Sequence, residues 1–183
     1  MNRSLWDWML ARPGSDRQIR PEPAARAQAT RSPQAVQRRA GSTAPVRRPA
    51  RERYDRMTRQ MLADYGVRVR KWRSSMSGVA WQVRYRDGSV SRLIESPRPR
   101  GPVSAAIFLH EIGHHAIGFN RVRPRCLEEY HAWAFSLAQM ESLEITVTDR
   151  VRQRVRDSLR YAVAKARRRG LKQVPRELES WIN

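Results

Sequence analysis

The residues of this chain with the clearest chemical potential are two histidines and a glutamate in the sequence His110-Glu111-Ile112-Gly113-His114. On a helix, side chains four residues apart lie one turn apart on the same face, so both imidazoles of this HExxH pattern can bind one metal ion. Glu111 would then lie beside the metal, where its carboxylate can take a proton from a water molecule that zinc makes more acidic. The pattern therefore predicts a Zn²⁺ site on a helix, with Glu111 as general base.

The residues around the pattern strengthen this interpretation. Positions 105–109 are apolar, which predicts a buried helix. Histidines in such a helix need partners, because an unsatisfied buried polar group costs about 1–3 kcal/mol; hydrogen-bonded core histidines are the alternative to metal ligands. Gly113 weakens the helix by about 1 kcal/mol relative to Ala but allows another segment to approach closely. His115 points about 100° away from His114, and we expect it to pack or to face solvent.

A catalytic zinc site usually has three protein ligands and one open position. The next predicted helix begins near Pro124 and carries four candidates for the third ligand: Cys126, Glu128, Glu129 and His131. Acidic residues in a first turn also interact with the helix dipole, which explains one of the two glutamates but not both. Tyr130 and His131 are further candidates for stabilising the oxyanion of a tetrahedral intermediate, with packing as the alternative role for Tyr130.

Residues 54–141 resemble the ImmA/IrrE metallopeptidases, which belong to the gluzincin group with thermolysin. The resemblance lies in HEIGH and in a Glu-x-x-Ala-x-x-Phe pattern at Glu129, Ala132 and Phe135. It implies a zincin-like fold, peptide-bond hydrolysis, zinc bound by His110, His114 and Glu129, and Glu111 as the base. The fourteen-residue gap between His114 and Glu129 is short for the family, and Trp133 stands where its members have asparagine. Glu128 therefore stays open as an alternative ligand.

Helices and strands must hold these residues in place. The order of the elements expected from the sequence predicts a compact α+β domain over 51–183. Helical spacing of apolar residues predicts a helix over 51–65, followed by a short strand from Val67. Alternation from Val79 to Tyr85 predicts a strand with one buried face, and the Asp87-Gly88 turn joins it to a return strand over 89–94. We expect a small antiparallel sheet. The 79–94 hairpin is a candidate edge for binding an extended peptide substrate, with an ordinary core hairpin as the alternative.

Three further helices are expected over 103–117, 125–141 and 148–169, with a short one near Pro175. The helix over 148–169 carries an apolar stripe of Val151, Val155, Leu159, Ala162 and Ala166. Between Arg150 and Arg176 the chain has eleven basic residues and a single acid, Asp157. We expect this basic face to be a solvated surface, a nucleic-acid-binding surface or a contact for an acidic protein.

The composition narrows the class of protein. The 183 residues include 37 Lys plus Arg against 17 Asp plus Glu, a net charge of +20. No apolar run approaches the roughly 18 residues of a membrane span. Cys126 is the only cysteine, which excludes a disulfide framework and favours a reducing compartment such as the cytoplasm.

Residues 1–50 differ in composition from the rest of the chain. They are rich in Arg, Pro and Ala and poor in large aliphatics, which predicts a disordered tail. The apolar cluster within MNRSLWDWML is a candidate docking peptide for a partner, with loose packing as the alternative. The Arg-rich and acid-poor tail also leaves organellar import open.

Two functions compete on these grounds. The first is a zinc metalloendopeptidase that acts on a protein or peptide substrate with Glu111 as general base. The alternative is a basic nucleic-acid-binding or scaffold protein whose zinc site is structural or inactive.

Overall fold

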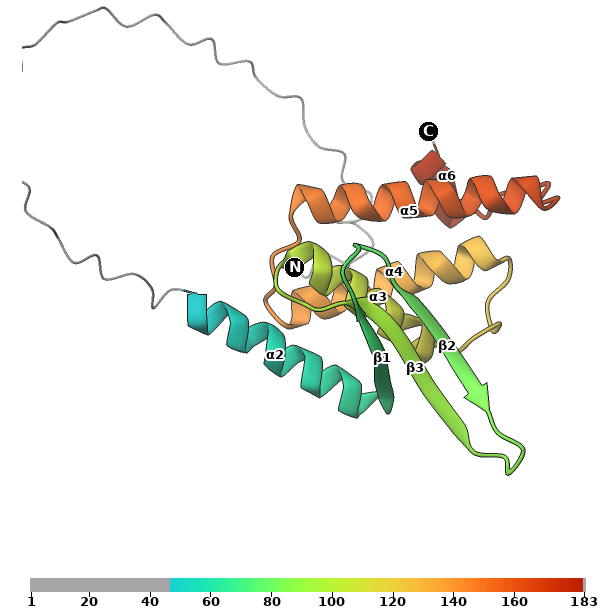
Figure 1. The fold of residues 1–183 in the computed structure, drawn as a ribbon. Coiled ribbons are helices and arrows are strands. Elements are labelled where there is room, and N and C mark those ends of the chain that lie inside the picture. The colour runs from blue at the N-terminus through green and yellow to red at the C-terminus, as the bar shows by residue number, and fades with distance from the viewer. Residues whose placement is uncertain (1–46, 183) are drawn as a thin grey trace, which may run out of the picture. The chain divides into compact units, whose positions relative to one another are not determined.

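A computed structural model of the chain describes residues 47–182 and confirms the α+β class. Residues 1–46 and 183 lie outside the described part, and with them the predicted docking cluster and nearly all of the predicted tail. Helix α2 begins four residues before the predicted domain start at 51. The elements in chain order are α2 (Arg47–Asp64), β1 (Val67–Arg73), β2 (Val79–Arg84), β3 (Val90–Pro97), α3 (Pro102–Ile117), α4 (Arg125–Ser142), α5 (Asp149–Arg168) and α6 (Arg176–Ile182) (Figure 1).

The sheet has three strands in the order β1-β3-β2, with β3 at its centre. Strand β3 is antiparallel to β2, as the Asp87-Gly88 turn predicts, but parallel to β1. The predicted antiparallel sheet is therefore wrong in this respect, because the sheet is mixed. The turn decides only the pairing of the two strands that it joins. Strand β1 precedes this hairpin in the chain and pairs with the edge of β3 that faces away from β2.

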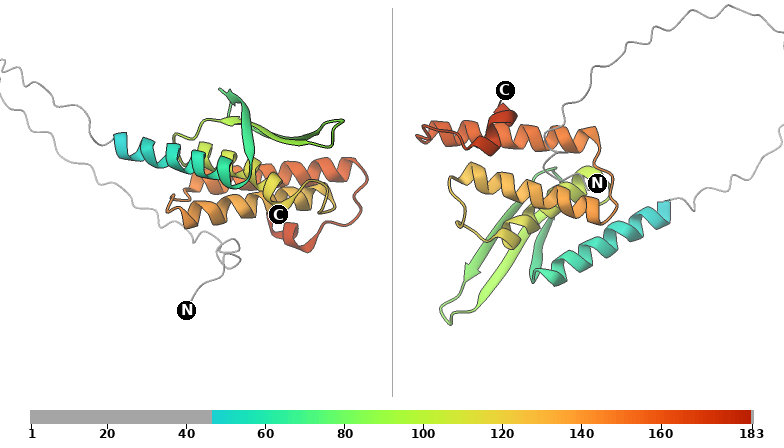
Figure 2. Two further views of the ribbon diagram at one scale, coloured as in Figure 1. Left: turned by 90° about the horizontal axis from the view of Figure 1, so that it is seen from below. Right: turned by 180° about the vertical axis from the view of Figure 1, so that it is seen from behind.

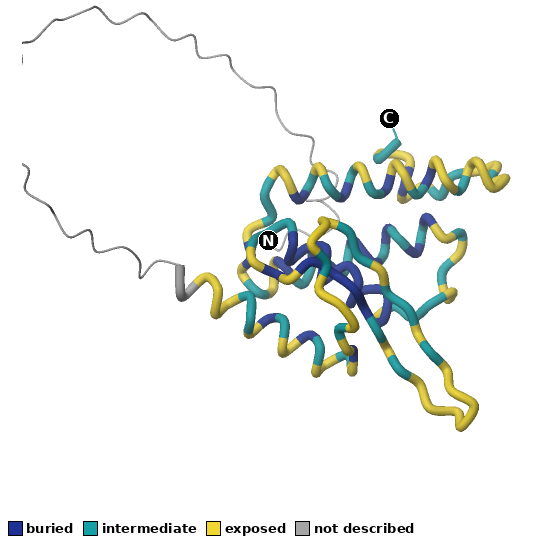
Figure 3. The backbone as a smooth tube through the Cα atoms, viewed as in Figure 1, coloured by how far each residue is buried: buried dark blue, intermediate teal, exposed yellow. Residues whose placement is uncertain are grey.

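The buried residues of the hairpin lie in β3 rather than in β2. Ile94 in β3 is fully buried, whereas Val79 and Tyr85, assigned to the buried face of the preceding strand, are 38% and 48% exposed. The reason is the position of β2 at the edge of the sheet and the length of the hairpin, whose tip extends beyond the helices (Figure 3). The predicted buried face of this strand is thus only half-buried.

Helix α3 lies at the centre of the domain. It is buried from Ser104 to His115, with the sheet on one side of the helices (Figure 2). A Cβ atom on Gly113 would lie 2.8 Å from the carbonyl oxygen of Ala132 in α4, so this glycine permits the close approach of the two helices. The hydroxyl of Ser136 donates a hydrogen bond of 2.7 Å to the Ala106 carbonyl across the same interface.

Helix α5 packs by one face only. Thr148 caps its first turn, and the side chains that it buries are Val151, Val155, Leu159 and Val163. The predicted stripe ended instead in Ala162 and Ala166, which are half-buried and line the cavity described below. None of the helices within residues 47–182 has the length and apolar character needed to cross a membrane.

Candidate metal centre

Side chains from α3 and α4 converge in a cluster of His110, His114 and Glu129 that could hold a metal ion. Glu129 Oε2 lies 3.3 Å from His110 Nε2 and 3.5 Å from His114 Nε2. Ligand atoms bound tetrahedrally at zinc distances lie about 3.3–3.4 Å from one another. These two separations fit a single ion, and all three ligand atoms lie within 4.8 Å of one another.

Glu128 occupies a different place from Glu129. Its Oε1 lies 3.3 Å from Nδ1 of His114, the ring nitrogen that faces away from Glu129, and its side chain is almost completely buried. Glu128 also forms an ion pair of 2.9 Å with Arg125 and accepts a hydrogen bond from the Asn120 amide. A carboxylate behind a metal-binding histidine fixes the orientation of the ring. The structure thus brings Glu129 to the cluster and puts Glu128 behind it.

The electrostatics of the cluster prepare it for a cation. Burial lowers the pKa of His110 to about 4, so this imidazole is neutral at ordinary pH. Burial acts in the same direction on His114, but its contacts with Glu128 and Glu129 outweigh this effect and raise its pKa to about 9. Burial would raise the pKa of Glu129, but its contacts with the two histidines hold it well below the usual range. A metal would therefore displace one proton from the cluster, that of His114.

Glu111 lies in the same cavity as the cluster, and burial raises the pKa of its carboxyl group to about 8. Gly78, in the loop between β1 and β2, lies directly against this side chain. A Cβ atom at position 78 would be 2.6 Å from Glu111 Cγ and closer still to the carboxylate. The loop and the helix can meet at Glu111 because residue 78 has no side chain.

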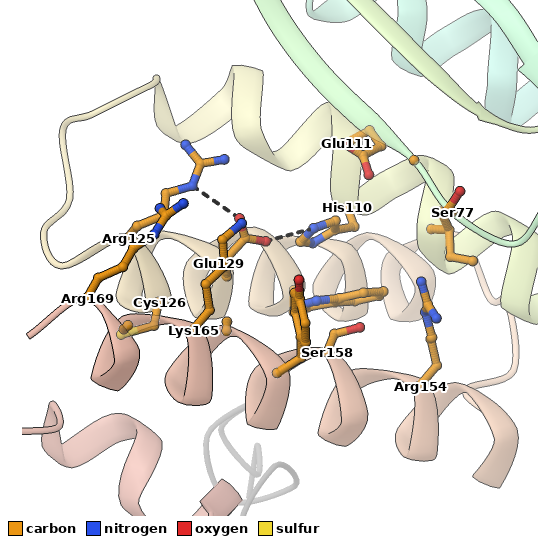
Figure 4. Close-up of a pocket in the computed structure, with 16 residues that line it drawn as sticks. Ser77, His110, Glu111, Arg125, Cys126, Glu129, Arg154, Ser158, Lys165 and Arg169 are labelled. Carbon is orange, nitrogen blue, oxygen red and sulfur yellow. Dashed lines mark hydrogen bonds and ion pairs between the residues drawn. The ribbon is translucent and has the colours of Figure 1, made fainter. Parts of the chain in front are cut away.

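The cavity has a volume of about 580 Å³ and opens between α3, α4, α5 and the loop before β2 (Figure 4). Sequence reasoning did not assign several of its lining residues to a site: Ser77, Gly78, Arg154, Ser158, Tyr161, Lys165 and Arg169. Four of these lie on α5 at spacings of three or four residues, and Arg169 directly follows the end of the helix. This spacing marks a helix face and is the signal that could have grouped them.

The other candidate residues of α4 have different positions. Cys126 lines the cavity but does not belong to the ligand cluster. Tyr130 and His131 are not among the cavity-lining residues, because each step along a helix turns a side chain by about 100° from Glu129. Tyr130 is buried and close enough to Glu177 of α6 for that carboxylate to help raise its pKa. The structure does not bring these two residues to the place of an oxyanion.

Two aromatic side chains complete the surroundings of the cluster. Trp133 stacks on His110 with ring centroids 4.1 Å apart and supports one side of that ligand. His115 is buried, and its Nε2 lies 3.1 Å from the Leu93 carbonyl of β3. Of the two expectations for His115, packing is confirmed.

Comparison of the chain with protein-family models, curated proteins and solved structures gave no match. The class of protein is therefore defined by its own fold and site: an α+β domain with a candidate centre of two histidines and one glutamate.

Proposed function

We propose that this protein is a zinc-dependent metallopeptidase with a zincin-like site. One observation carries the proposal: the ligand atoms of His110, His114 and Glu129 lie within 4.8 Å of one another, beside a cavity lined by His110, Glu129 and Glu111. The HEIGH sequence and the Glu-x-x-Ala-x-x-Phe pattern, which resemble those of the gluzincins, support the same function.

The donor set favours zinc. Two imidazoles and one carboxylate form a common ligand set of catalytic zinc sites, which leave one position for water or substrate. When bound, zinc supplies a Lewis acid that polarises the scissile carbonyl and lowers the pKa of a water molecule. Glu128 orients the ring of His114 through Nδ1, and Trp133 holds the ring of His110 by stacking.

Glu111 transfers the proton in this proposal. Its carboxylate accepts a proton from the attacking water as the new carbon–oxygen bond forms, and then donates that proton to the amine nitrogen as the carbon–nitrogen bond breaks. A carboxyl group with a pKa near 8 is suited to both steps near neutral pH. Gly78 leaves the space that the carboxylate of Glu111 occupies at the cavity wall.

The edge of β2 offers a path for an extended substrate. Within residues 47–182 the outer edge of this strand has no strand partner, and the strand begins directly after Gly78. A second hollow of about 430 Å³ continues along Ala80, Trp81 and Gln82 and shares Arg125 with the cavity. A peptide that added to this edge by main-chain hydrogen bonds would pass close to Glu111.

The test combines metal analysis with a cleavage assay. The purified full chain should contain about one zinc per molecule and cleave members of a peptide library. Glu111→Gln should keep the zinc and lose cleavage by about 100-fold or more, because the amide cannot accept the proton. His131→Gln, on α4 but outside the cavity, serves as the control and should behave as the wild type. Equal cleavage by Glu111→Gln would contradict the role of Glu111, and zinc binding without hydrolysis of any peptide would favour the scaffold alternative.

A further inference from the structure

The wall that α5 contributes to the cavity is basic. Arg154, Lys165 and Arg169 all line it, and none of the three forms an ion pair with another residue of the described part. The two acids of the cavity, Glu111 and Glu129, are already used as base and ligand in the proposed function. Arg125 differs from these three cations because it pairs with Glu128 and Glu129. These three charges therefore have no acidic partner within the described residues; Lys165 and Arg169 are exposed, and Lys165 Nζ lies 6.0 Å from the centroid of the Tyr161 ring.

Arg154 is the most informative of the three. Its Nε is buried and has no hydrogen-bond partner within residues 47–182. Its charge also helps lower the pKa of His110, so it lies near the ligand cluster. A buried guanidinium nitrogen without a partner is costly, and in native proteins such groups usually have a ligand or water to bind. The side chain as a whole is only half-buried and lines the cavity, so an anionic group of a substrate there would meet the guanidinium charge.

Arg169 lies at the opposite end of the cavity. Figure 4 shows Arg154 on the side of Ser77 and Arg169 on the side of Arg125, with His110 between them and Lys165 beside Glu129. The fifteen residues from Arg154 to Arg169 correspond to about 22 Å along a helix, the length of six or seven residues of extended peptide. A bound peptide would thus meet positive charge on both sides of the metal centre.

We propose that the substrates are acidic peptides with side-chain carboxylates on both sides of the scissile bond, one bound by Arg154 and the other by Lys165 and Arg169. This inference rests on the proposed peptidase function. It gives the basic helix a role inside the cavity, where a double helix of nucleic acid cannot enter. Tyr161 is the only aromatic side chain that α5 adds to the wall, and Trp133 of α4, which also lines the cavity, is already stacked on His110.

Binding can be measured separately from cleavage in the zinc-loaded Glu111→Gln variant. The probes are labelled eight-residue peptides of one sequence with Glu, Gln or Lys at positions 2 and 7, on either side of the central bond, each with a free and an amidated C-terminus. Glu peptides should bind at least tenfold more tightly than Gln peptides, and the C-terminus should make little difference. Equal binding of Glu and Gln peptides would overturn the inference, as would a preference that disappears on amidation, which would point to a terminal carboxylate.

Variants of α5 locate the contacts. In the same Glu111→Gln background, Arg154→Gln and Lys165→Gln should each weaken binding of the Glu peptide about tenfold and leave binding of the Gln peptide nearly unchanged. The matched controls are Arg167→Gln and Arg168→Gln, which remove the same charge from exposed positions of the same helix outside the cavity. Equal losses in the controls would overturn the inference, because they would show an effect of net charge alone.

Two further measurements separate this inference from the proposed function. If the wild type cleaves Gln and Glu peptides at equal rates, the peptidase proposal stands and the substrate class is wrong. If the Glu peptide binds as expected but the wild type cleaves no peptide, the binding site stands and the peptidase proposal fails. A short DNA duplex that displaces the bound peptide at a comparable concentration would overturn the assignment to peptides.

Discussion

Helices α3 and α5 form walls of the same cavity but contribute to it in different ways. Helix α3 is buried almost throughout, and five consecutive residues of it supply two ligands and the proposed base. Helix α5 buries only four side chains and presents basic residues to the cavity over about three turns, with Arg169 just beyond its end. The chemistry thus depends on spacing within one short segment, whereas the charge around it depends on how a distant helix packs. Changes to α3 should therefore remove the metal centre, and changes to α5 should alter only what binds beside it.

The largest effect should come from loss of a ligand. His114→Ala should lower zinc affinity by roughly 100-fold or more, because it removes one of three protein ligands. Arg169→Gln, at the C-terminal end of α5, should leave zinc affinity within about twofold, because a guanidinium does not bind the metal. Competition with a chromophoric chelator measures both. A comparable loss of zinc in Arg169→Gln would break the distinction between the two helices.

The pH dependence of metal binding should be nearly as large. Because the pKa of His114 is raised to about 9 in the metal-free protein, a proton must leave before the metal binds at neutral pH. Zinc affinity should therefore rise with pH, about tenfold for each unit between pH 6 and 8. The measurement belongs in Glu111→Gln, where the carboxyl group with a pKa of about 8 cannot add a second proton. A flat profile would show that His114 is already neutral.

A smaller effect is expected from the residue behind the ligand. Glu128→Gln should lower zinc affinity about 10- to 100-fold, the usual range for groups that orient a ligand. Glu129→Gln, its neighbour on α4, should cause the greater loss. Both affinities can be measured with the same chelator. The reverse order would show that Glu128 is the ligand, and that α4 is rotated relative to the arrangement described here.

The last effect concerns the stability of the fold rather than metal binding. Gly113→Ala should lower the free energy of unfolding by about 1–3 kcal/mol, because the added methyl group would overlap the backbone of Ala132 in α4. Gly101→Ala, just before α3, has open space around it and serves as the control. Denaturant unfolding of both metal-free proteins measures the difference. An unchanged free energy of unfolding in Gly113→Ala would mean that α3 and α4 can move apart without loss of stability, contrary to their close packing at Gly113 and Ala132.

The elements that carry the ligands could be predicted closely from the sequence. The expected helices over 103–117 and 125–141 correspond to Pro102–Ile117 and Arg125–Ser142. Apolar periodicity along each helix, with Gly101 before α3 and Pro124 before α4, is a local signal, and the start of each helix follows from it. The HExxH spacing likewise predicts which two histidines meet, because both lie on one helix.

The remaining features depend on contacts between distant segments. Val67 of β1 pairs with Arg92 of β3, and no local signal in the chain announces that parallel pairing. The choice between Glu128 and Glu129 depends on the rotation of α4 against α3, which adjacent glutamates cannot reveal. Ala162 and Ala166 fit an apolar stripe as well as a cavity wall, since alanine is small enough for either. Sequence therefore predicted the ligand helix better than the walls around it.

Gly78 has a consequence for natural variation. A position without room for one methyl group can accept no other amino acid while Glu111 keeps its place. Every missense change of this codon would displace Glu111, the proposed base, although residue 78 is itself neither a ligand nor a base. Wherever selection maintains activity, we expect variation at this codon to be confined to synonymous changes, and a loop residue with no functional group to be as intolerant of change as the histidines.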